Sequence, residues 1–507
     1  MEEQRSKLNF PVAIAELPKF LVTAVMLMMT IYIYSILRAS KDAIVVVQMG
    51  AELISIIKLY GVLPAAILFM LIYVKLSDVF TRATLYHILV TFFVGFFLVF
   101  NYILYPNAKS LQIDVSNLVE MMPYLKYFFI MFSNWPCTLF YIFSELWGTV
   151  MLSLMFWQLA NQICTIPEAK RFYPLFGLLG QAGLIAAGIL GKVFSGIDES
   201  ADGKMTAPPE ELWQNALNNI TLSVVVSAAM LSLCLWYLGR IVGNDAINIT
   251  QSSKSSKKKV KLNFGESLKY VMSSKYIGLI TLLVLCYGIS INLVEGVWKK
   301  SLSIQFPDSA RYSNFMGDVQ VWTGVATALA MLSGSFLLRI VSWRTAAVLT
   351  PVMILVTGII FFLFMVFKTE LEPTVIAFGA TAIAVAVFSG AAQNILSKAT
   401  KYSFFDPTKE MSYIPLDDDL KSKGKAAADG IGGRLGKSGG ALIQSTMLML
   451  MPGASLISLA PNLFMIFLVT MVIWVVAVFA LAKEFAIKSA EAAEHAAADA
   501  NEKEVSA

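Results

Sequence analysis

The stretch Tyr287–Lys300, YGISINLVEGVWKK, determines the fold class of this chain. It ends an apolar run that begins near Ile277 and is long enough to cross a bilayer as a helix. Glu295 lies near the end of the run, followed by Trp298 and two lysines. A carboxylate near or inside a bilayer costs roughly 2.5–3.5 kcal/mol unless it faces a cavity or a partner. The stretch therefore predicts a membrane helix whose charged end faces water or other ionised groups.

The composition extends this prediction to the whole chain. Hydrophobic residues make up 57% of the 507 residues and charged residues 14%, against about 25% charged in soluble domains. The four cysteines lie in or beside apolar runs, which favours isolated thiols, and two histidines are too few for a histidine metal site. We expect an all-α integral membrane protein with no metal and no cofactor. Twelve apolar runs are long enough to span a membrane: 20–37, 57–76, 85–105, 136–160, 172–195, 217–239, 276–298, 318–338, 344–367, 373–396, 430–452 and 461–482.

The distribution of lysine and arginine predicts the orientation. If both termini are cytoplasmic, most of the 39 basic residues fall in cytoplasmic segments, as the positive-inside rule requires. The long central loop contains SSKSSKKKVK (252–261), which we interpret as a solvated linker and not as a nucleic-acid site. We therefore expect a six-helix half at 1–240, a basic cytoplasmic linker at 241–275, a second six-helix half at 276–482 and a cytoplasmic tail at 483–507.

An internal repeat supports the division into halves. Three short matches occur in the same order, between spans 1 and 7, 4 and 10, and 5 and 11. Two six-helix halves in one orientation are the parallel repeat of major-facilitator transporters, in which substrate binds near mid-membrane between the halves. The matches are Tyr34-Ser-Ile-Leu with Ile289-Ser-Ile-Asn, Phe156-x-x-x-Ala-Asn-Gln-Ile with Phe388-x-x-x-Ala-Gln-Asn-Ile, and Gly177-x-Leu-Gly-Gln-Ala-Gly with Gly433-x-Leu-Gly-Lys-Ser-Gly.

Charged and polar residues fall on the spans that this plan places around the cavity. Arg38 and Lys41 end the first span, Glu145 lies inside the fourth, Glu295 ends the seventh, and Asn394 lies in the tenth. Cations in such a cavity would hold the phosphates of a large anion, and carboxylates would pair the cations when the site is empty.

Other interpretations of these charges stay open from the sequence. Arg38 and Lys41 are also placed to snorkel at a helix end. Glu145 would then form a buried structural pair, and Glu295 a pair with Lys299 or with a base of the first span. The segment GGRLGKS (432–438) is similar to a phosphate loop, but Ile431 stands where the first glycine is required and no strand precedes it, so an ATPase is rejected. Lys437 in this segment is still placed to meet phosphate near a helix start.

The sequence resembles the ATP/ADP translocases, nucleotide transporters of obligate intracellular bacteria and plastids. The resemblance runs through nearly the whole chain and implies twelve spans and nucleotide exchange, typically ATP for ADP, without hydrolysis. It also implies that Lys41, Glu145, Glu295 and Lys437 matter for transport. The matching runs are LRASKD (37–42), ELWGTVMLSLMFWQLANQI (145–163), EAKRFY (168–173), YGISINLVEGVWK (287–299), QNILSKATKYSFFD (393–406), YIPLD (413–417), KGKAA (423–427) and GKSGGALIQ (436–444).

Together these observations predict a transporter and not an enzyme. We expect ATP and ADP as substrates, with GTP, UTP, CTP or phosphate, and proton-coupled import, as alternatives. The expected setting is the lipid bilayer of the bacterial inner membrane, with a monomeric chain that binds no nucleic acid. The predicted substrate-binding residues are Arg38, Lys41, Glu145, Glu295, Asn394 and Lys437.

Overall fold

The structure is a computed structural model of the chain. In the part of the chain that it describes, the regular secondary structure is helical apart from two two-residue strands, β1 (Ile197–Asp198) and β2 (Lys204–Met205), which pair antiparallel. Most of the predicted linker 241–275 lies outside the described residues. These are 12–198, 204–205, 207–243, 274–417, 424–425, 428 and 432–505.

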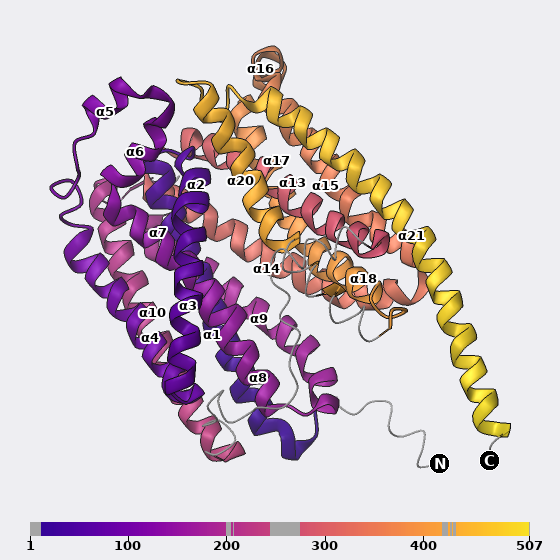
Figure 1. The fold of residues 1–507 in the computed structure, drawn as a ribbon. Helices are drawn as coiled ribbons and strands as arrows, with labels where there is room; N and C mark the ends of the chain where they lie inside the picture. Colours follow the sequence, from indigo (N-terminus) through magenta and orange to yellow (C-terminus); the bar gives the residue numbers. More distant parts are fainter. Residues whose placement is uncertain are drawn as a thin grey trace.

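The N-terminal half is a bundle of six long helical segments, shown in indigo to magenta in Figure 1. Short helices follow the first segment and precede the fourth, and π-helical turns continue the second, third and fourth. The helices are α1 (Leu17–Gln48), α2 (Leu53–Ile56), α3 (Leu63–Val79), α4 (Arg82–Val99), α5 (Ser116–Met121), α6 (Lys126–Ser133), α7 (Trp135–Trp147), α8 (Trp157–Ile163), α9 (Ile166–Ser195) and α10 (Pro209–Val242), with 3-10 turns at Ile14–Glu16 and Pro123–Leu125 and π-helical turns at Ile57–Val62, Phe100–Leu104 and Gly148–Phe156.

The C-terminal half is the orange to yellow bundle of Figure 1. Its last helix continues past the predicted end of the membrane span, through the segment predicted as the tail. The helices are α13 (Lys275–Gln305), α14 (Ser309–Ile340), α15 (Trp343–Val366), α16 (Lys368–Ala377), α17 (Ala382–Thr400), α18 (Asp406–Met411), α20 (Gly433–Leu450) and α21 (Ala460–Val505), with a π-helical turn at Lys401–Phe405 between α17 and α18.

Among the described residues, eleven helices are long and apolar enough to cross a membrane, so the chain is a multi-pass membrane protein. The remaining predicted span, the eleventh at 430–452, corresponds to α20, a shorter helix that packs on α13. A Cβ atom on Gly288 of α13 would lie 2.6 Å from the backbone carbonyl carbon of Gly436, so the two backbones touch at glycine.

Three predicted boundaries are wrong, two of them for the same reason. Counting apolar residues ends the first and seventh spans at 37 and 298, but α1 and α13 continue to Gln48 and Gln305 because their charged ends pair inside the protein. The predicted span 373–396 instead divides between α16 and α17. The helix is interrupted at Gly379, which has a φ of +77°. The side chain of Thr381 then caps α17 by accepting a hydrogen bond from the Ala384 amide.

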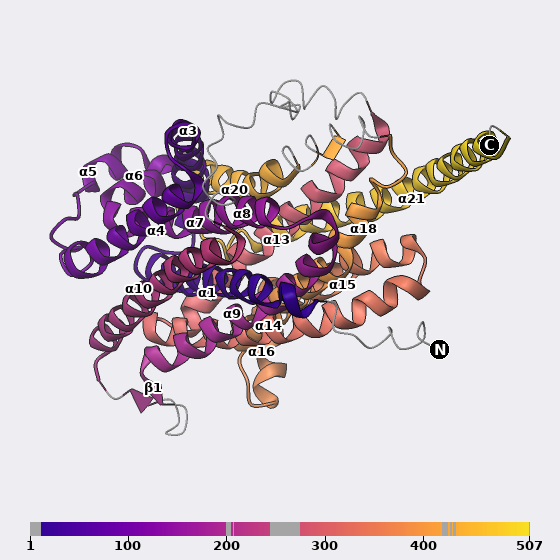
Figure 2. The same cartoon turned by 90° about the horizontal axis from the view of Figure 1, so that it is seen from below.

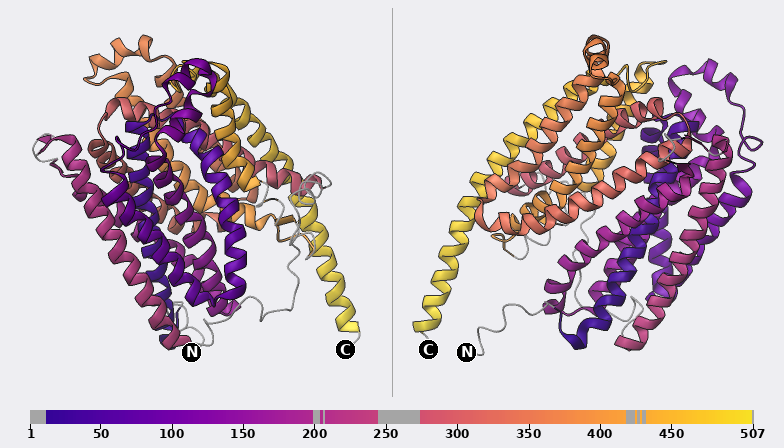
Figure 3. Two further views of the ribbon diagram at one scale, coloured as in Figure 1. Left: turned by 60° about the vertical axis from the view of Figure 1, so that its left-hand side comes forward. Right: turned by 180° about the vertical axis from the view of Figure 1, so that it is seen from behind.

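The two halves meet along α9 and α14. A Cβ atom on Gly188 would lie 2.5 Å from the carbonyl oxygen of Gly317, so these helices also touch through their backbones. Seen at right angles in Figure 2, α1 and α9 of the first half lie beside α14 of the second. Figure 3 shows that the ribbons of the two halves converge at the end that carries α5, α6 and α16 and diverge toward the termini.

Candidate functional site

The charged residues of α1 pair with a carboxylate from α7. Arg38, Lys41 and Asp42 are three and four residues apart, a spacing that places side chains together on a helix. The Lys41 ammonium lies 2.8 Å from Oδ1 of Asp42, 3.0 Å from Oε1 of Glu145 and 3.8 Å from the ring centroid of Tyr141. Lys41 and Asp42 are 1% and 0% exposed. Ion pairs and the ring face therefore stabilise charges that water does not reach.

Helix α13 brings a second pair of charges against the first. The Lys299 ammonium lies 2.9 Å from Oε1 of Glu295, one turn earlier, and 2.9 Å from Oδ2 of Asp42. The guanidinium of Arg38 lies 3.1 Å from Oε1 of Glu295. Lys58, from the π-helical turn before α3, lies 3.6 Å from Oε2 of Glu295. Ionised groups therefore join the two halves of the molecule.

We call these seven side chains the ion network. It holds four cations and three carboxylates, so it carries an excess of positive charge. Lys398 of α17 is a further basic side chain near this network. It interacts electrostatically with Arg38 and Glu295, and the described residues place no carboxylate within ion-pair distance of it. The members of the network are Arg38, Lys41, Asp42, Lys58, Glu145, Glu295 and Lys299.

The structure brings four of the six predicted site residues into this network. Lys41 lies inside α1, well before its end, which excludes snorkelling as the explanation of that residue. The pairs of Glu295 with Lys299 and with a first-span base, considered as structural alternatives, are both present. Glu295 thus has three cations within 4 Å, two of them from the other half. The four residues are Arg38, Lys41, Glu145 and Glu295.

The other two predicted residues are not placed in the network. Asn394 is buried on α17, where its side-chain amide donates to the carbonyl oxygen of Gly390 in its own helix, 2.9 Å away. Its neighbour Gln393 is 1% exposed, and the described residues offer its Nε2 no hydrogen-bond partner. Lys437 belongs to α20, but its side chain lies outside the described residues.

A second set of contacts between the halves lies beside the network. Glu52, at the start of α2, is 3% exposed and lies 3.1 Å from the ammonium of Lys300. Its Oε1 also accepts a hydrogen bond from the backbone amide of Leu456, 3.3 Å away. We call these three residues the Glu52 clasp. Nearby, the hydroxyl of Tyr127 donates to the carbonyl oxygen of Ala454.

Comparisons with known proteins identify the family. The model of the family described as TLC ATP/ADP transporter matches residues 2–485. The chain is 41% identical to ADP,ATP carrier protein 3 of Rickettsia felis, over 95% of this chain and 97% of the relative. It is 40% identical to ADP,ATP carrier protein 1 of Rickettsia prowazekii, over 95% and 96% of the two chains. The chain belongs to the TLC ATP/ADP transporter family.

Solved structures show which fold this TLC family member has. It aligns with a bacterial homologue of the iron transporter ferroportin in its inward-facing state, with a TM-score of 0.60 and 14% identity over 93% of this chain and 99% of that one. The inward-open xylose transporter XylE from E. coli aligns with a TM-score of 0.53 and 11% identity over 91% and 94%. These likenesses confirm the predicted fold of two helical halves.

Sequence reasoning about this TLC family member missed several of the charges around the site. Lys58 was overlooked, since it lies within a predicted apolar span and no motif includes it. The sequence predicts Lys299 only as a structural partner of Glu295 and assigns Asp42 no role, although the spacing of Asp42 from Arg38 and of Lys299 from Glu295 is that of one helix face. The sequence motifs do not single out Lys398, but it lies one helical turn after Asn394 in the run QNILSKATK, and this spacing is the signal that points to it.

Proposed function

We propose that this chain exchanges ATP for ADP across a membrane by alternating access, without hydrolysing either nucleotide. One observation carries the proposal: in a family of ATP/ADP transporters, the charges that join the two halves of this chain include an excess of cations. Nucleotide phosphates are the class of ligand that such an excess favours, because each phosphate oxygen accepts charge-assisted hydrogen bonds from lysine or arginine.

The exposure of each residue supports a division of roles within the network. Lys41 and Lys299 are 1% exposed, and Asp42 lies between them. We assign these three to holding the halves in register. The side chains of Arg38 and Lys58 are 32% and 25% exposed, and these two cations would leave Glu295 to bind phosphate.

Lys398 would supply a third cation for the phosphates. The described residues place no carboxylate within ion-pair distance of it, so no ion pair has to break before it binds phosphate. Glu145, with its side chain 22% exposed, interacts electrostatically with Arg38 and would re-pair cations as substrate leaves. Asn394 and Lys437 remain predicted binding residues from the sequence.

The energetics of exchange follow from charge. ATP carries about one more negative charge than ADP, so each exchange moves about one net charge, worth roughly 2.3 kcal/mol per 100 mV of membrane potential. The concentration gradients of the two nucleotides and this potential would therefore set the direction.

The orientation and setting complete the proposal. We place the chain as a monomer in a bacterial inner membrane, with both termini in the cytoplasm as the basic segments favour. The transport units would be 1–240 and 276–482, joined by the basic linker 241–275 and followed by the tail 483–507.

Proteoliposomes test the exchange. We expect labelled ATP to enter vesicles loaded with ADP and not empty vesicles, with no release of inorganic phosphate. Uptake into empty vesicles driven by a pH gradient would favour the alternative, proton-coupled import. Competition by unlabelled GTP, UTP and CTP would identify any other nucleotide that is carried. No exchange with any nucleotide would refute the proposal.

A further inference from the structure

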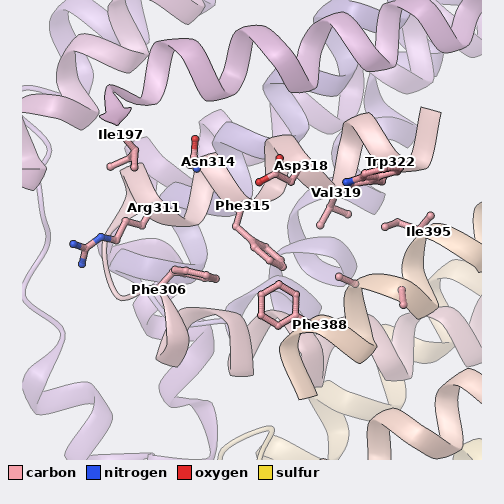
Figure 4. Close-up of a pocket in the computed structure, with 12 residues that line it drawn as sticks. Ile197, Phe306, Arg311, Asn314, Phe315, Asp318, Val319, Trp322, Phe388 and Ile395 are labelled. Carbon is pink, nitrogen blue, oxygen red and sulfur yellow. The ribbon is translucent and has the colours of Figure 1, made fainter. Parts of the chain in front are cut away.

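A cavity separate from the ion network lies on the side of α14. It has a volume of about 620 Å³ and lies between α14 and α17, with Ile197 of strand β1 at one edge. Figure 4 shows aromatic side chains from the end of α13, from α14 and from α17 meeting in it. The ring centroids of Phe306 and Phe315 are 5.1 Å apart, and those of Phe315 and Phe388 are 5.6 Å apart.

The aromatic wall continues to a side chain that is open to the surroundings of the helix bundle. Trp322 is 62% exposed and Phe388 is 60% exposed. Both belong to helices long and apolar enough to cross a membrane. Large apolar side chains this exposed on a spanning helix face acyl chains, so the cavity opens to lipid and not to the aqueous site between the halves.

Two charged side chains, Arg311 and Asp318, line the cavity. Arg311, in the first turn of α14, has a side chain that is 44% exposed, and its nearest carboxylate oxygen in the described part of the chain belongs to Asp308, 3.8 Å away. Asp318 also lines the cavity, but it lies 2.6 Å from the ammonium of Lys192 and is neutralised. The cavity therefore offers one available cation at its end and an apolar wall beyond it.

The length of this wall corresponds to one leaflet of a bilayer. Arg311 and Trp322 lie at opposite ends of the row in Figure 4 and are eleven residues apart on one helix. At 1.5 Å per residue they are about 16 Å apart along the axis. Half of the hydrocarbon core is about 15 Å. A guanidinium at the helix start would then lie at the depth of the headgroups, with the aromatic rings at the depth of the chains.

We propose that this cavity binds a phospholipid with an anionic headgroup. One acyl chain lies along Phe315, Phe388 and Trp322, and Arg311 pairs with a headgroup phosphate whose charge no headgroup cation neutralises. The lipid also links the halves, because Ile197 directly follows α9 of the first half and the other lining residues belong to the second. The same boundary carries the Lys192–Asp318 pair and a hydrogen bond from the hydroxyl of Ser195 to Asn314. A bound lipid therefore stabilises the arrangement in which these helices touch.

Native mass spectrometry of the purified full chain tests the proposal. The protein is stripped of lipid and then mixed with equal amounts of phosphatidylglycerol and phosphatidylcholine. We expect Arg311→Gln to lower the ratio of bound anionic to bound zwitterionic lipid about fivefold, the factor for one basic residue near an anionic surface. We expect Ala392→Trp, which fills the cavity from α17, to lower the retention of both lipids. Arg339→Gln is the matched control, an exposed arginine at the other end of α14, and should leave the ratio unchanged.

Two outcomes would overturn the proposal. An unchanged ratio in Arg311→Gln, or an equal fall in Arg339→Gln, would mean that lipid associates with the whole surface and not with this cavity. Full retention in a monodisperse Ala392→Trp protein would mean that the aromatic wall holds no chain. The binding assay does not depend on the proposed transport function. A wild-type protein that retains lipid but exchanges no nucleotide would count against that function alone.

Discussion

Replacing Glu295 by glutamine tests whether the ion network holds the two halves together. The amide keeps the size of the carboxylate but removes its charge. Arg38, Lys58 and Lys299 all lie within 4 Å of that charge, and the first two come from the other half. Breaking a buried ion pair by removing one partner costs about 3–5 kcal/mol.

That magnitude is large for a conformational equilibrium. At about 1.4 kcal/mol for each factor of ten, a loss of 3–5 kcal/mol shifts the balance between two arrangements by a factor of roughly 100 to several thousand. We expect Glu295→Gln to leave the arrangement described above sparsely populated and to abolish ATP/ADP exchange, while the protein still reaches the membrane. Lys41→Ala should also abolish exchange, because it strips Glu145 of its cation.

Pulsed electron paramagnetic resonance measures the distance between spin labels placed on the two halves. In a cysteine-free background, spin labels at Tyr124 and Phe378, both exposed and in different halves, report the separation at the end where the ribbons converge. Glu295→Gln should lengthen this distance. Glu168→Gln is the matched control, because its partner Lys19 belongs to the same half. Wild-type distances and near-normal exchange in Glu295→Gln would refute the idea that the network joins the halves.

Three further predictions use matched variants. Lys398→Gln should raise the KM for ATP about tenfold or more, because a hydrogen bond to a charged group contributes roughly 1.5–3 kcal/mol. Lys109→Gln removes a lysine whose side chain is 90% exposed and should leave the KM unchanged. Gly188→Ala should destabilise the protein by about 1–3 kcal/mol through overpacking and so lower its thermal unfolding midpoint, because the new Cβ atom would meet the Gly317 carbonyl. A Cβ atom at Gly191 would meet nothing within 4 Å, so Gly191→Ala should leave the midpoint unchanged. Lys300→Gln should lengthen the Tyr124–Phe378 spin-label distance, because it leaves Glu52 buried without its cation. An unchanged distance would mean that the Glu52 clasp does not help to hold the two halves together.

The sequence was a good guide to what each helix contains and a poor guide to where it ends. Hydropathy found α1 and α13 but ended the predicted spans at 37 and 298, next to Arg38 and Lys299, because a transfer scale treats every charge as if it were unpaired. In the folded chain those charges lie against each other, so the helices continue. The break at Gly379 was missed for the opposite reason, since a turn inside an apolar run hardly changes the mean hydropathy of the run.

The site was predictable as a set of residues and not as a set of contacts. The repeat and the buried charges indicated that Lys41 and Glu295 come from facing helices. They did not indicate that Asp42 and Lys299 lie between these two. That arrangement depends on which face of α1 and which face of α13 point toward each other. Packing on α7, α14 and α20 sets this orientation, and no periodic pattern in the sequence indicates it. Lys58 was missed because a single lysine in an apolar run gives no pattern.

The retention of carboxylates beside a site for anions follows from the requirements of exchange. A purely cationic cavity would bind phosphate tightly, but once empty it would hold mutually repelling charges and resist closing. Glu295 removes that repulsion by pairing Arg38 and Lys58 across the halves. In the proposed mechanism, arriving phosphates would compete for the same two cations, so binding would loosen the contacts that hold this arrangement. The pairs between Lys41, Asp42 and Lys299 are almost inaccessible to solvent and would not be open to the same competition. On this proposal the network combines ion pairs that substrate can displace with ion pairs that it cannot, and the displaceable pairs would make separation of the halves depend on a bound nucleotide.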